Sequence, residues 1–275
     1  MHTDLIQRQY NDIIAAHYDH DPQSVTSDSL DRAVAQCLRW QAAGADGVSL
    51  KVFDVGMGTG LFLRKLRAGA GRSIQPFGLD LSEKMIEVAR TKIPDLTAVV
   101  DNADNLDAHF PHESFDLIAT HFITGFVPAS VLAPKIWDRL GGGGCWSLIG
   151  GTKQGFPGLQ SKANSRILRW AFGGKKLEVD EVVCNPADRA ELVQTLEQSG
   201  FAIRECETFR PEIRFADLNE FLVFAYYGGW LTPFVEALGL HQARAVLRLV
   251  LNTFVFPISD HHCIEVVLAQ KGERR

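Results

Sequence analysis

The fold of this chain is decided by residues 51–62, which read Lys-Val-Phe-Asp-Val-Gly-Met-Gly-Thr-Gly-Leu-Phe. The first five residues are mostly apolar and β-branched, a pattern typical of a buried strand. Glycines then alternate with other residues, and the apolar residues that follow suit one face of a helix: Gly56, Gly58 and Gly60, then Leu61, Leu63 and Leu66. A loop without Cβ atoms can lie against a bound molecule, and the N–H groups of the first helical turn face it. The stretch therefore predicts a ligand site.

The spacing of the glycines narrows the class of ligand. A dinucleotide-binding loop has its third glycine three positions after the second, where this chain has Leu61. Gly60 comes one residue early, and Asp54 lies two residues before the first glycine. The run Asp-Val-Gly-Met-Gly-Thr-Gly resembles the acidic-x-Gly-x-Gly-x-Gly motif of the class I S-adenosylmethionine-dependent methyltransferases. A glycine turn without a ligand, or a nicotinamide site with an irregular loop, is the alternative.

Carboxylates follow the next two predicted strands. Asp80 and Leu81 lie near the end of a strand, with Asp80 24 residues after Gly56, and one carboxylate can accept hydrogen bonds from both ribose hydroxyls. The resemblance implies this role for Asp80, and Ser82 also suits the cap of a helix over residues 83–91. Asp101 and Asn102 follow a strand over residues 97–100, where the family contacts adenine; Asp104 is the rival, or the cluster is a solvated turn.

A second stretch, residues 110–118, also resembles the family, at its fourth strand: Phe-Pro-His-Glu-Ser-Phe-Asp-Leu-Ile. The resemblance implies an α/β fold, a doubly wound, seven-stranded, mostly parallel Rossmann-like sheet with an antiparallel last strand. It points to the small-molecule type of enzyme, UbiE/MenG-like or of secondary metabolism. We expect an N-terminal helical lid over residues 1–46, or simple packing of these helices on the sheet edge. The core then spans residues 47–275, with helical cap insertions at about 152–184 and 213–256.

Composition limits the partners and the setting. The net charge is −5 and lysine- or arginine-rich blocks are absent from the sequence, which disfavours a nucleic-acid substrate. The five cysteines are scattered, which favours a reduced, cytoplasmic setting over a disulfide framework. The apolar run over residues 221–235 is interrupted by glycine and proline and is too short to span a membrane. We expect a monomer or homodimer.

Several residues are candidates for the acceptor side of the site. His121 ends the fourth predicted strand, where open α/β sheets bind ligands, and it is either a general base or a residue that packs against the cofactor. The resemblance places Tyr18 on the cofactor. The second cap is rich in aromatic residues, which form core or line an acceptor pocket, and the candidates for acceptor binding are Phe122, Tyr226, Tyr227 and Trp230. His261 and His262 point opposite ways on a strand, so we expect no metal site.

The leading hypothesis is transfer of the methyl group of S-adenosylmethionine, in line, to a small apolar or aromatic metabolite, leaving S-adenosylhomocysteine. The sequence leaves open whether oxygen, nitrogen or carbon receives the methyl group. A regulatory or cyclase-like protein that binds the cofactor without transferring methyl is the alternative from another class. A nicotinamide oxidoreductase is disfavoured by Leu61.

Overall fold

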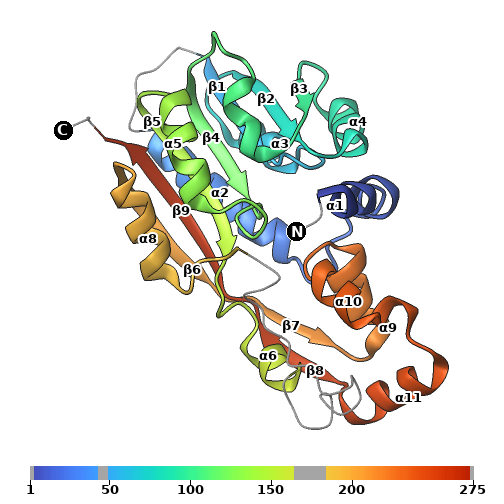
Figure 1. Cartoon of the computed structure of the whole chain (residues 1–275). Coiled ribbons are helices and arrows are strands. Elements are labelled where there is room, and N and C mark those ends of the chain that lie inside the picture. Colours follow the sequence, from blue (N-terminus) through green and yellow to red (C-terminus); the bar gives the residue numbers. More distant parts are fainter. Residues whose placement is uncertain (1–2, 43–48, 164–183, 273–275) are drawn as a thin grey trace.

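The computed structural model describes residues 3–42, 49–163 and 184–272 of the chain (Figure 1). Its first half contains α1 (Thr3–Gln9), the π-helix η1 (Tyr10–Ile14), α2 (Val25–Ala42), β1 (Leu50–Val55), α3 (Leu61–Gly69), β2 (Ile74–Asp80), α4 (Glu83–Lys92), β3 (Thr97–Val100), the 3₁₀-helix η2 (Ala103–Ala108), β4 (Phe115–His121), α5 (Ala129–Arg139) and β5 (Leu140–Gly151). The second half contains α6 (Pro157–Ala163), α8 (Arg189–Gln198), β6 (Phe201–Phe209), β7 (Glu212–Phe215), α9 (Leu218–Leu222), η4 (Val223–Tyr227), α10 (Thr232–Leu238), η5 (Leu240–Gln242), α11 (Ala245–Phe254), β8 (Ile258–His261) and β9 (Ile264–Lys271).

Seven strands form one twisted sheet in the order β3-β2-β1-β4-β5-β9-β6. The pairs from β3 to β5 are parallel, whereas β9 runs antiparallel to both of its neighbours. The strand order reverses beside β1, so the carboxyl ends of β1 and β4 border a crevice, the usual ligand position in doubly wound sheets. The predicted fold class, including the antiparallel last strand, is confirmed.

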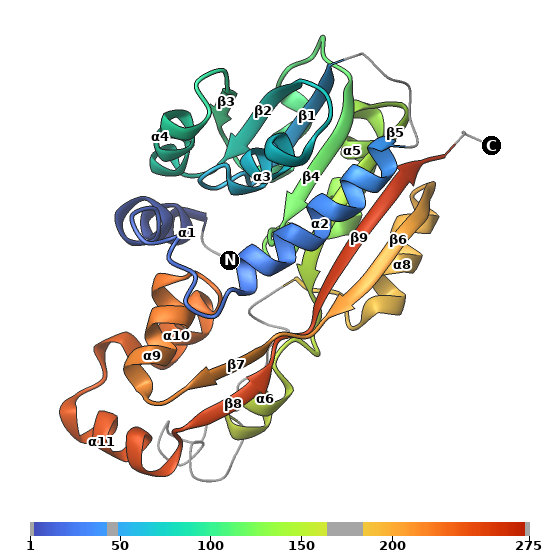
Figure 2. The same cartoon turned by 180° about the vertical axis from the view of Figure 1, so that it is seen from behind.

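Helices cover both faces of the sheet. Helix α2 crosses β5 and β9 on one face and packs on α3 (Figure 2). On the other face α5 packs on α8, and Trp146 of β5 is fully buried there. The indole N–H of Trp146 donates to Thr120 Oγ1 over 2.7 Å. Each face therefore buries its own apolar cluster, as expected for a sheet whose central strands are apolar throughout.

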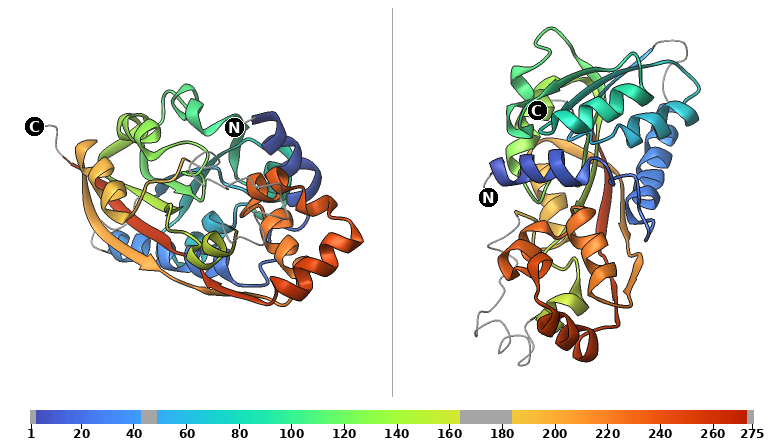
Figure 3. Two further views of the ribbon diagram at one scale, coloured as in Figure 1. Left: turned by 60° about the horizontal axis from the view of Figure 1, so that its bottom comes forward. Right: turned by 90° about the vertical axis from the view of Figure 1, so that its right-hand side faces the viewer.

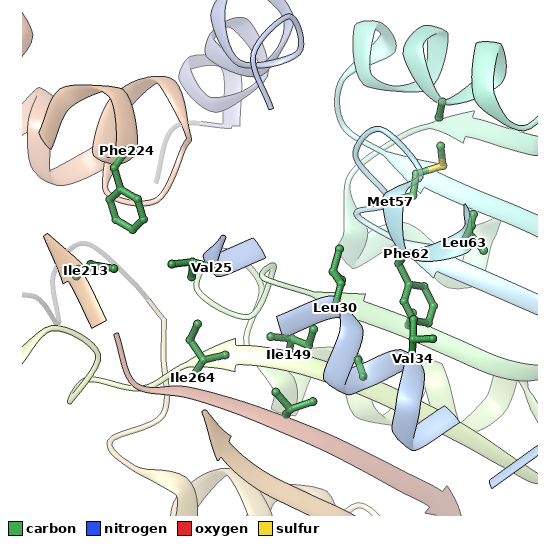
Figure 4. Packing of buried hydrophobic residues seen from close by; sticks show 14 of the residues in the cluster. Val25, Leu30, Val34, Met57, Phe62, Leu63, Ile149, Ile213, Phe224 and Ile264 are labelled. Carbon is green, nitrogen blue, oxygen red and sulfur yellow. The ribbon is translucent and has the colours of Figure 1, made fainter. Parts of the chain in front are cut away.

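A second, two-stranded sheet carries the C-terminal cap. Strands β7 and β8 pair antiparallel and extend beyond the ends of β6 and β9, and they hold the helices from α9 to α11 (Figure 1). The apolar cluster under α2 continues into this cap: Figure 4 shows side chains from Phe62 through Ile149 and Ile264 to Ile213 and Phe224. The N-terminal segment, which comprises α1, η1 and the residues up to His20, lies between α4 and the cap (Figure 3).

Some sequence-based boundaries were wrong. Apolar spacing in the sequence predicts one helix over residues 4–20 and a second from about Leu30 to Ala42. In the structure the first ends as an α-helix at Gln9, and α2 starts five residues earlier than predicted, at Val25. The pair Asn185-Pro186 predicts a helix capped by Asn185, but α8 is capped by Asp188, whose Oδ1 accepts from the Glu191 N–H over 3.0 Å.

Two further expectations concerned the cap and a glycine run. The second cap is helical from α9 to α11, as predicted, but the sequence did not predict β7, which overlaps its first residues. The four consecutive glycines at 141–144 predict a turn between a helix and the fifth strand, but in the structure they lie within β5. The sequence also predicts a short basic helix over residues 162–170, most of which lies outside the described residues.

Candidate functional site

The glycine loop follows β1 and leads into α3. Gly56, Gly58 and Gly60 all have positive φ angles, of 73°, 52° and 75°. A methyl group on Gly56 would lie 2.3 Å from Cγ2 of Ile123, in the loop after β4. Glycine adopts such backbone conformations without strain, and a side chain at Gly56 would collide with Ile123. The loop is therefore built for close contact, as its sequence predicted.

Two buried carboxyl groups lie under this loop, at the ends of β1 and β2. The Gly58 and Ser82 N–H groups donate to Asp80 Oδ2 and Oδ1, each over 2.8 Å. Burial raises the pKa of Asp80 to about 6, although these backbone hydrogen bonds oppose the shift. Burial and the charge of Asp80 raise the pKa of Asp54 to about 8. A cationic ligand here would favour the ionised form of Asp54.

The N-terminal segment is hydrogen-bonded across the same loops. Gln7 Nε2 donates to the Leu81 carbonyl over 3.1 Å, and Asn11 Oδ1 accepts from the Ser82 hydroxyl over 2.7 Å. The Thr59 hydroxyl donates to Asp19 Oδ1 over 2.6 Å. These contacts hold the segment over the glycine loop.

Two tyrosines of the segment lie against the carboxyl groups. A methyl group on Gly58 would lie 3.4 Å from Cε1 of Tyr18, in ordinary contact with its ring. Burial and nearby charges, including Asp80 and Asp54, raise the pKa of the Tyr18 phenol. Burial and the charge of Asp80 do the same for Tyr10. Both phenols are therefore neutral donors beside the predicted cofactor site.

The polar cluster after β3 is engaged in local hydrogen bonds. Asp101 Oδ1 accepts from Asn105 Nδ2 over 3.0 Å, and Oδ2 lies 2.6 Å from His109 Nε2. These bonds lower the pKa of Asp101. Asn102 caps η2 by accepting from the Asp104 N–H over 3.3 Å. Asp101 is thus held in its ionised form. It lies next to the end of β2, because its backbone N–H donates to the Asp80 carbonyl over 3.1 Å.

His121 is 7% exposed and packs on the α2 and α3 side of the sheet. Its Nε2 lies 3.0 Å from Ser147 Oγ, and its ring meets Phe62 edge-on with centroids 4.3 Å apart. Burial lowers the pKa of His121 to about 3, so the imidazole is neutral at physiological pH.

The four predicted acceptor residues lie in three places. Phe122, with a φ of 62°, meets Trp230 edge-on with ring centroids 4.8 Å apart. Tyr226 points into the cap, where its hydroxyl donates to Glu236 over 2.9 Å. Tyr227 is 43% exposed and lines an open groove of about 300 Å³ together with His17, His20, Val223 and Gly228.

Sequence reasoning missed several residues that the fold brings to this region. Gln7, Tyr10 and Asn11 carry no motif, and only their helical spacing could have placed them on one side of the segment. His262 was weighed only as a metal ligand, yet it is buried against Phe156 and Trp230.

Among the described residues, groups of three or more His, Cys, Asp or Glu side chains placed to hold a metal ion are not found. None of the described helices has the length and apolar character needed to cross a membrane.

Comparison with known proteins places these features in a family. Residues 52–140 match the model of a methyltransferase domain. A ubiquinone biosynthesis O-methyltransferase of Thiobacillus denitrificans is 37% identical over 102 residues, which is 35% of this chain and 42% of that protein. A demethylmenaquinone methyltransferase of Tropheryma whipplei is 31% identical over 147 residues, covering 48% of this chain and 56% of that protein. The chain thus spans about half the length of the curated relatives it matches.

A solved structure shares the fold over a longer stretch. The YcgJ protein of Bacillus subtilis superposes with a TM-score of 0.57 at 17% identity, over 89% of this chain and 100% of that one. A likeness at this identity concerns the fold. Together with the sheet order and the family match, it shows that residues 52–140 carry a methyltransferase domain and that the chain has the fold of the class I S-adenosylmethionine-dependent methyltransferases.

Proposed function

We propose that this protein binds S-adenosylmethionine on the Gly56–Gly60 loop and transfers its methyl group to a small-molecule acceptor under the cap. The observation that carries the proposal is the loop of three positive-φ glycines above the buried pair Asp54 and Asp80. The cofactor carries ammonium and sulfonium charges and a ribose with two hydroxyls. Asp54 would meet the charge and Asp80 the ribose, since a carboxylate at the end of the second strand suits two hydroxyls.

The remaining contacts of the cofactor follow from the same arrangement. Asp101 and Asn102 lie one strand further along, next to Asp80, and are assigned to adenine. Tyr18 is assigned to the methionine end, because its ring contacts Gly58. The segment that carries Tyr18 is bonded to both loops, which supports a lid that excludes water.

The chemistry needs alignment more than it needs an acid or base. The cofactor supplies an activated methyl group; its carbon–sulfur bond breaks as the acceptor forms the new bond, and the electron pair stays on sulfur. The chain has to hold the two partners in line and keep water out. The low pKa of His121 and its contacts with Phe62 and Ser147 support its role as a packing residue over the general-base role.

The names of the relatives suggest a quinone-type or similarly lipophilic acceptor, and we include such a metabolite in the proposal. We also propose a cytoplasmic setting, which the five free cysteine thiols support. The proposed working form is a monomer or homodimer.

Calorimetry with S-adenosylmethionine, S-adenosylhomocysteine and NAD tests the proposal. We expect both sulfur ligands to bind and NAD to bind weakly or not at all. Binding of NAD alone would contradict the proposal. Tight binding of the sulfur ligands with no methylation across a panel of aromatic hydroxyl, amine and enol acceptors would favour a cofactor-binding protein without transferase activity.

A test of His121 belongs with it. His121→Phe keeps a ring against Phe62, so turnover and its pH profile should be close to those of the wild type if His121 only packs. Loss of the acidic limb from the pH–rate profile, where a general base is protonated, would restore the general-base role.

A further inference from the structure

Five aromatic rings meet where the cap joins the main sheet, and we call them the aromatic cluster: Phe122, Phe156, Phe224, Trp230 and His262. The His262 ring stacks on Phe156 with centroids 4.0 Å apart and planes 16° apart. It meets Trp230 edge-on at 5.0 Å, and Trp230 in turn contacts Phe122 at 4.8 Å. Phe224 stacks on Trp230 with ring centroids 5.6 Å apart. The cluster thus runs without a break from the end of β4 to His262.

His262 is an unusual member of this cluster because one of its two ring nitrogens has no hydrogen-bond partner among the described residues. Its side chain is 5% exposed, and its Nδ1 is buried without a hydrogen-bond partner among the described residues. Burial lowers the pKa of His262 to about 3, so the ring is neutral and can accept a hydrogen bond. An unsatisfied buried nitrogen costs free energy unless a ligand or water supplies the partner.

The ring of His262 is fixed in place from both sides. Asp260 accepts from the N–H groups of Gly158 and Leu159, over 3.0 and 2.7 Å, which ties the start of α6 to β8. The Cys263 N–H donates to the Gly155 carbonyl over 2.8 Å. These bonds flank Phe156 and His262 in sequence, so the stack is held by backbone contacts.

Part of the cluster is open, and a second polar group lies beside it. Phe122, Phe156 and Trp230 are each only half-buried. A methyl group on Gly151, at the end of β5, would lie 3.3 Å from Asn185 Nδ2 and 3.8 Å from His262 Nε2. An amide and an imidazole therefore converge at the carboxyl edge of the sheet, beside flat apolar rings, as in sites that bind planar molecules with one polar group.

We propose that the aromatic cluster binds the methyl acceptor, and that the acceptor is a planar aromatic molecule whose phenolic hydroxyl donates a hydrogen bond to His262. The inference rests on the proposed methyltransferase function and names the acceptor class of that site. Phe122 borders the glycine-loop side through its neighbour Ile123, which packs on Gly56, so a ring bound along the cluster lies next to the donor side. His262 acts as a positioning residue that orients the hydroxyl.

The test compares 4-ethylphenol with its methyl ether, 4-ethylanisole, by calorimetry on protein saturated with S-adenosylhomocysteine. The wild type should bind the phenol more tightly than the ether. His262→Phe keeps the stack on Phe156 and removes the nitrogen, so the Kd of the phenol should rise about three- to tenfold, the usual size of one neutral hydrogen bond. The Kd values of the ether and of S-adenosylhomocysteine should not change.

His261→Phe is the matched control, since His261 is the exposed neighbour on β8, and all three Kd values should stay as in the wild type. Absence of phenol binding to the loaded wild type, or equal losses for phenol and ether in His262→Phe, would overturn the inference and leave the methyltransferase proposal standing. Failure of S-adenosylhomocysteine to bind would instead contradict the proposed function. Should His262→Phe not fold, Trp230→Leu carries the test, and it should weaken the phenol and the ether equally; unchanged binding of both would refute the site.

Discussion

At the scale of single residues, Gly56 determines how closely the β1 loop approaches the loop after β4. We expect Gly56→Ala to destabilise the protein by about 1–3 kcal/mol, because it combines a strained positive φ with a contact to Ile123 of 2.3 Å. Binding of S-adenosylhomocysteine should weaken in parallel. Thermal melting and calorimetry measure the two effects.

Gly142→Ala is the control for that substitution. Gly142 has no atom within 4 Å of the added methyl group, and its φ is not positive, so melting should be unchanged. Equal melting temperatures for Gly56→Ala and Gly142→Ala would show that the loop tolerates a side chain.

Asp54 should couple cofactor binding to pH. Its pKa of about 8 in the free protein means that most of the carboxyl is protonated at pH 6, and an ammonium group favours the ionised form. The affinity for S-adenosylhomocysteine should therefore rise with pH below 8, by up to about tenfold per pH unit. Calorimetry in buffers of different ionisation enthalpy should detect the released proton.

Asp54→Asn supplies the comparison for this coupling. The variant should bind more weakly at pH 8 and lose the pH dependence. A wild-type affinity that is flat from pH 6 to 8 would rule out Asp54 as the partner of the charge.

At the scale of elements, the N-terminal segment is held over the site by polar contacts. The double variant Asn11→Ala/Asp19→Ala removes the acceptors of the Ser82 and Thr59 hydroxyls. Each such bond contributes about 1 kcal/mol. Backbone amides of residues 10–19 should exchange severalfold faster, and S-adenosylhomocysteine should dissociate faster. Hydrogen-exchange mass spectrometry and stopped-flow measurements follow the two rates.

Glu87→Ala is the matched control for this variant, because it removes an exposed ion pair with Lys84 on the same side of the molecule. Such pairs contribute little to stability. Faster exchange in the control, or unchanged exchange in the double variant, would show that these two hydrogen bonds do not hold the N-terminal segment in place.

Some of the helices and strands could be predicted from the sequence alone, and others could not. The apolar runs of β1 and β9 predicted these two buried strands, because such runs carry a signal that does not depend on context. The antiparallel direction of β9 came from the resemblance to the methyltransferase family. The sequence did not predict the start of α2 at Val25 or the cap of α8 at Asp188, because several neighbouring polar residues were equally suitable as the N-cap of each helix. Strand β7 was missed because its four residues gain stability only by pairing with β8, 46 residues later in the chain.

The site shows the same division between motif and context. Asp54, the three glycines and Asp80 belong to one motif and its fixed interval, and the structure brings them together. His262 and Phe156 are more than 100 residues apart in sequence, and their stacking depends on the cap. A single histidine in a sequence carries no sign of whether its nitrogens will find partners.

At the scale of the whole molecule, four buried groups should shape the pH dependence of stability. Asp80 and Asp54 have pKa values raised to about 6 and about 8. The stability that each adds at low pH is therefore lost as the pH rises through its raised pKa. His121 and His262 have pKa values lowered to about 3, so their contribution is present above about 6.5 and is lost as the pH falls. The two sets oppose each other between about pH 4 and 6.5.

Above pH 6.5 Asp54 alone of these four continues to titrate. We expect the free protein to lose about 1–2 kcal/mol of stability between pH 6.5 and 8, measured by urea unfolding. Asp54→Asn should remove most of this decline. The same slope in the variant would assign the decline to other groups.

The apolar cluster that joins Phe62, Ile149, Ile264 and Phe224 has a consequence for how ligands enter and leave (Figure 4). Because the cap shares one buried interior with the sheet, it cannot rotate as a separate body without exposing that interior to water. The N-terminal segment, in contrast, is joined to the loops by a few hydrogen bonds, and it buries fewer apolar side chains than the cap, Ile14 among them. Exchange of ligands should therefore proceed by local release of residues 10–20, at a rate set by that short segment, while cap and sheet unfold together in one cooperative transition.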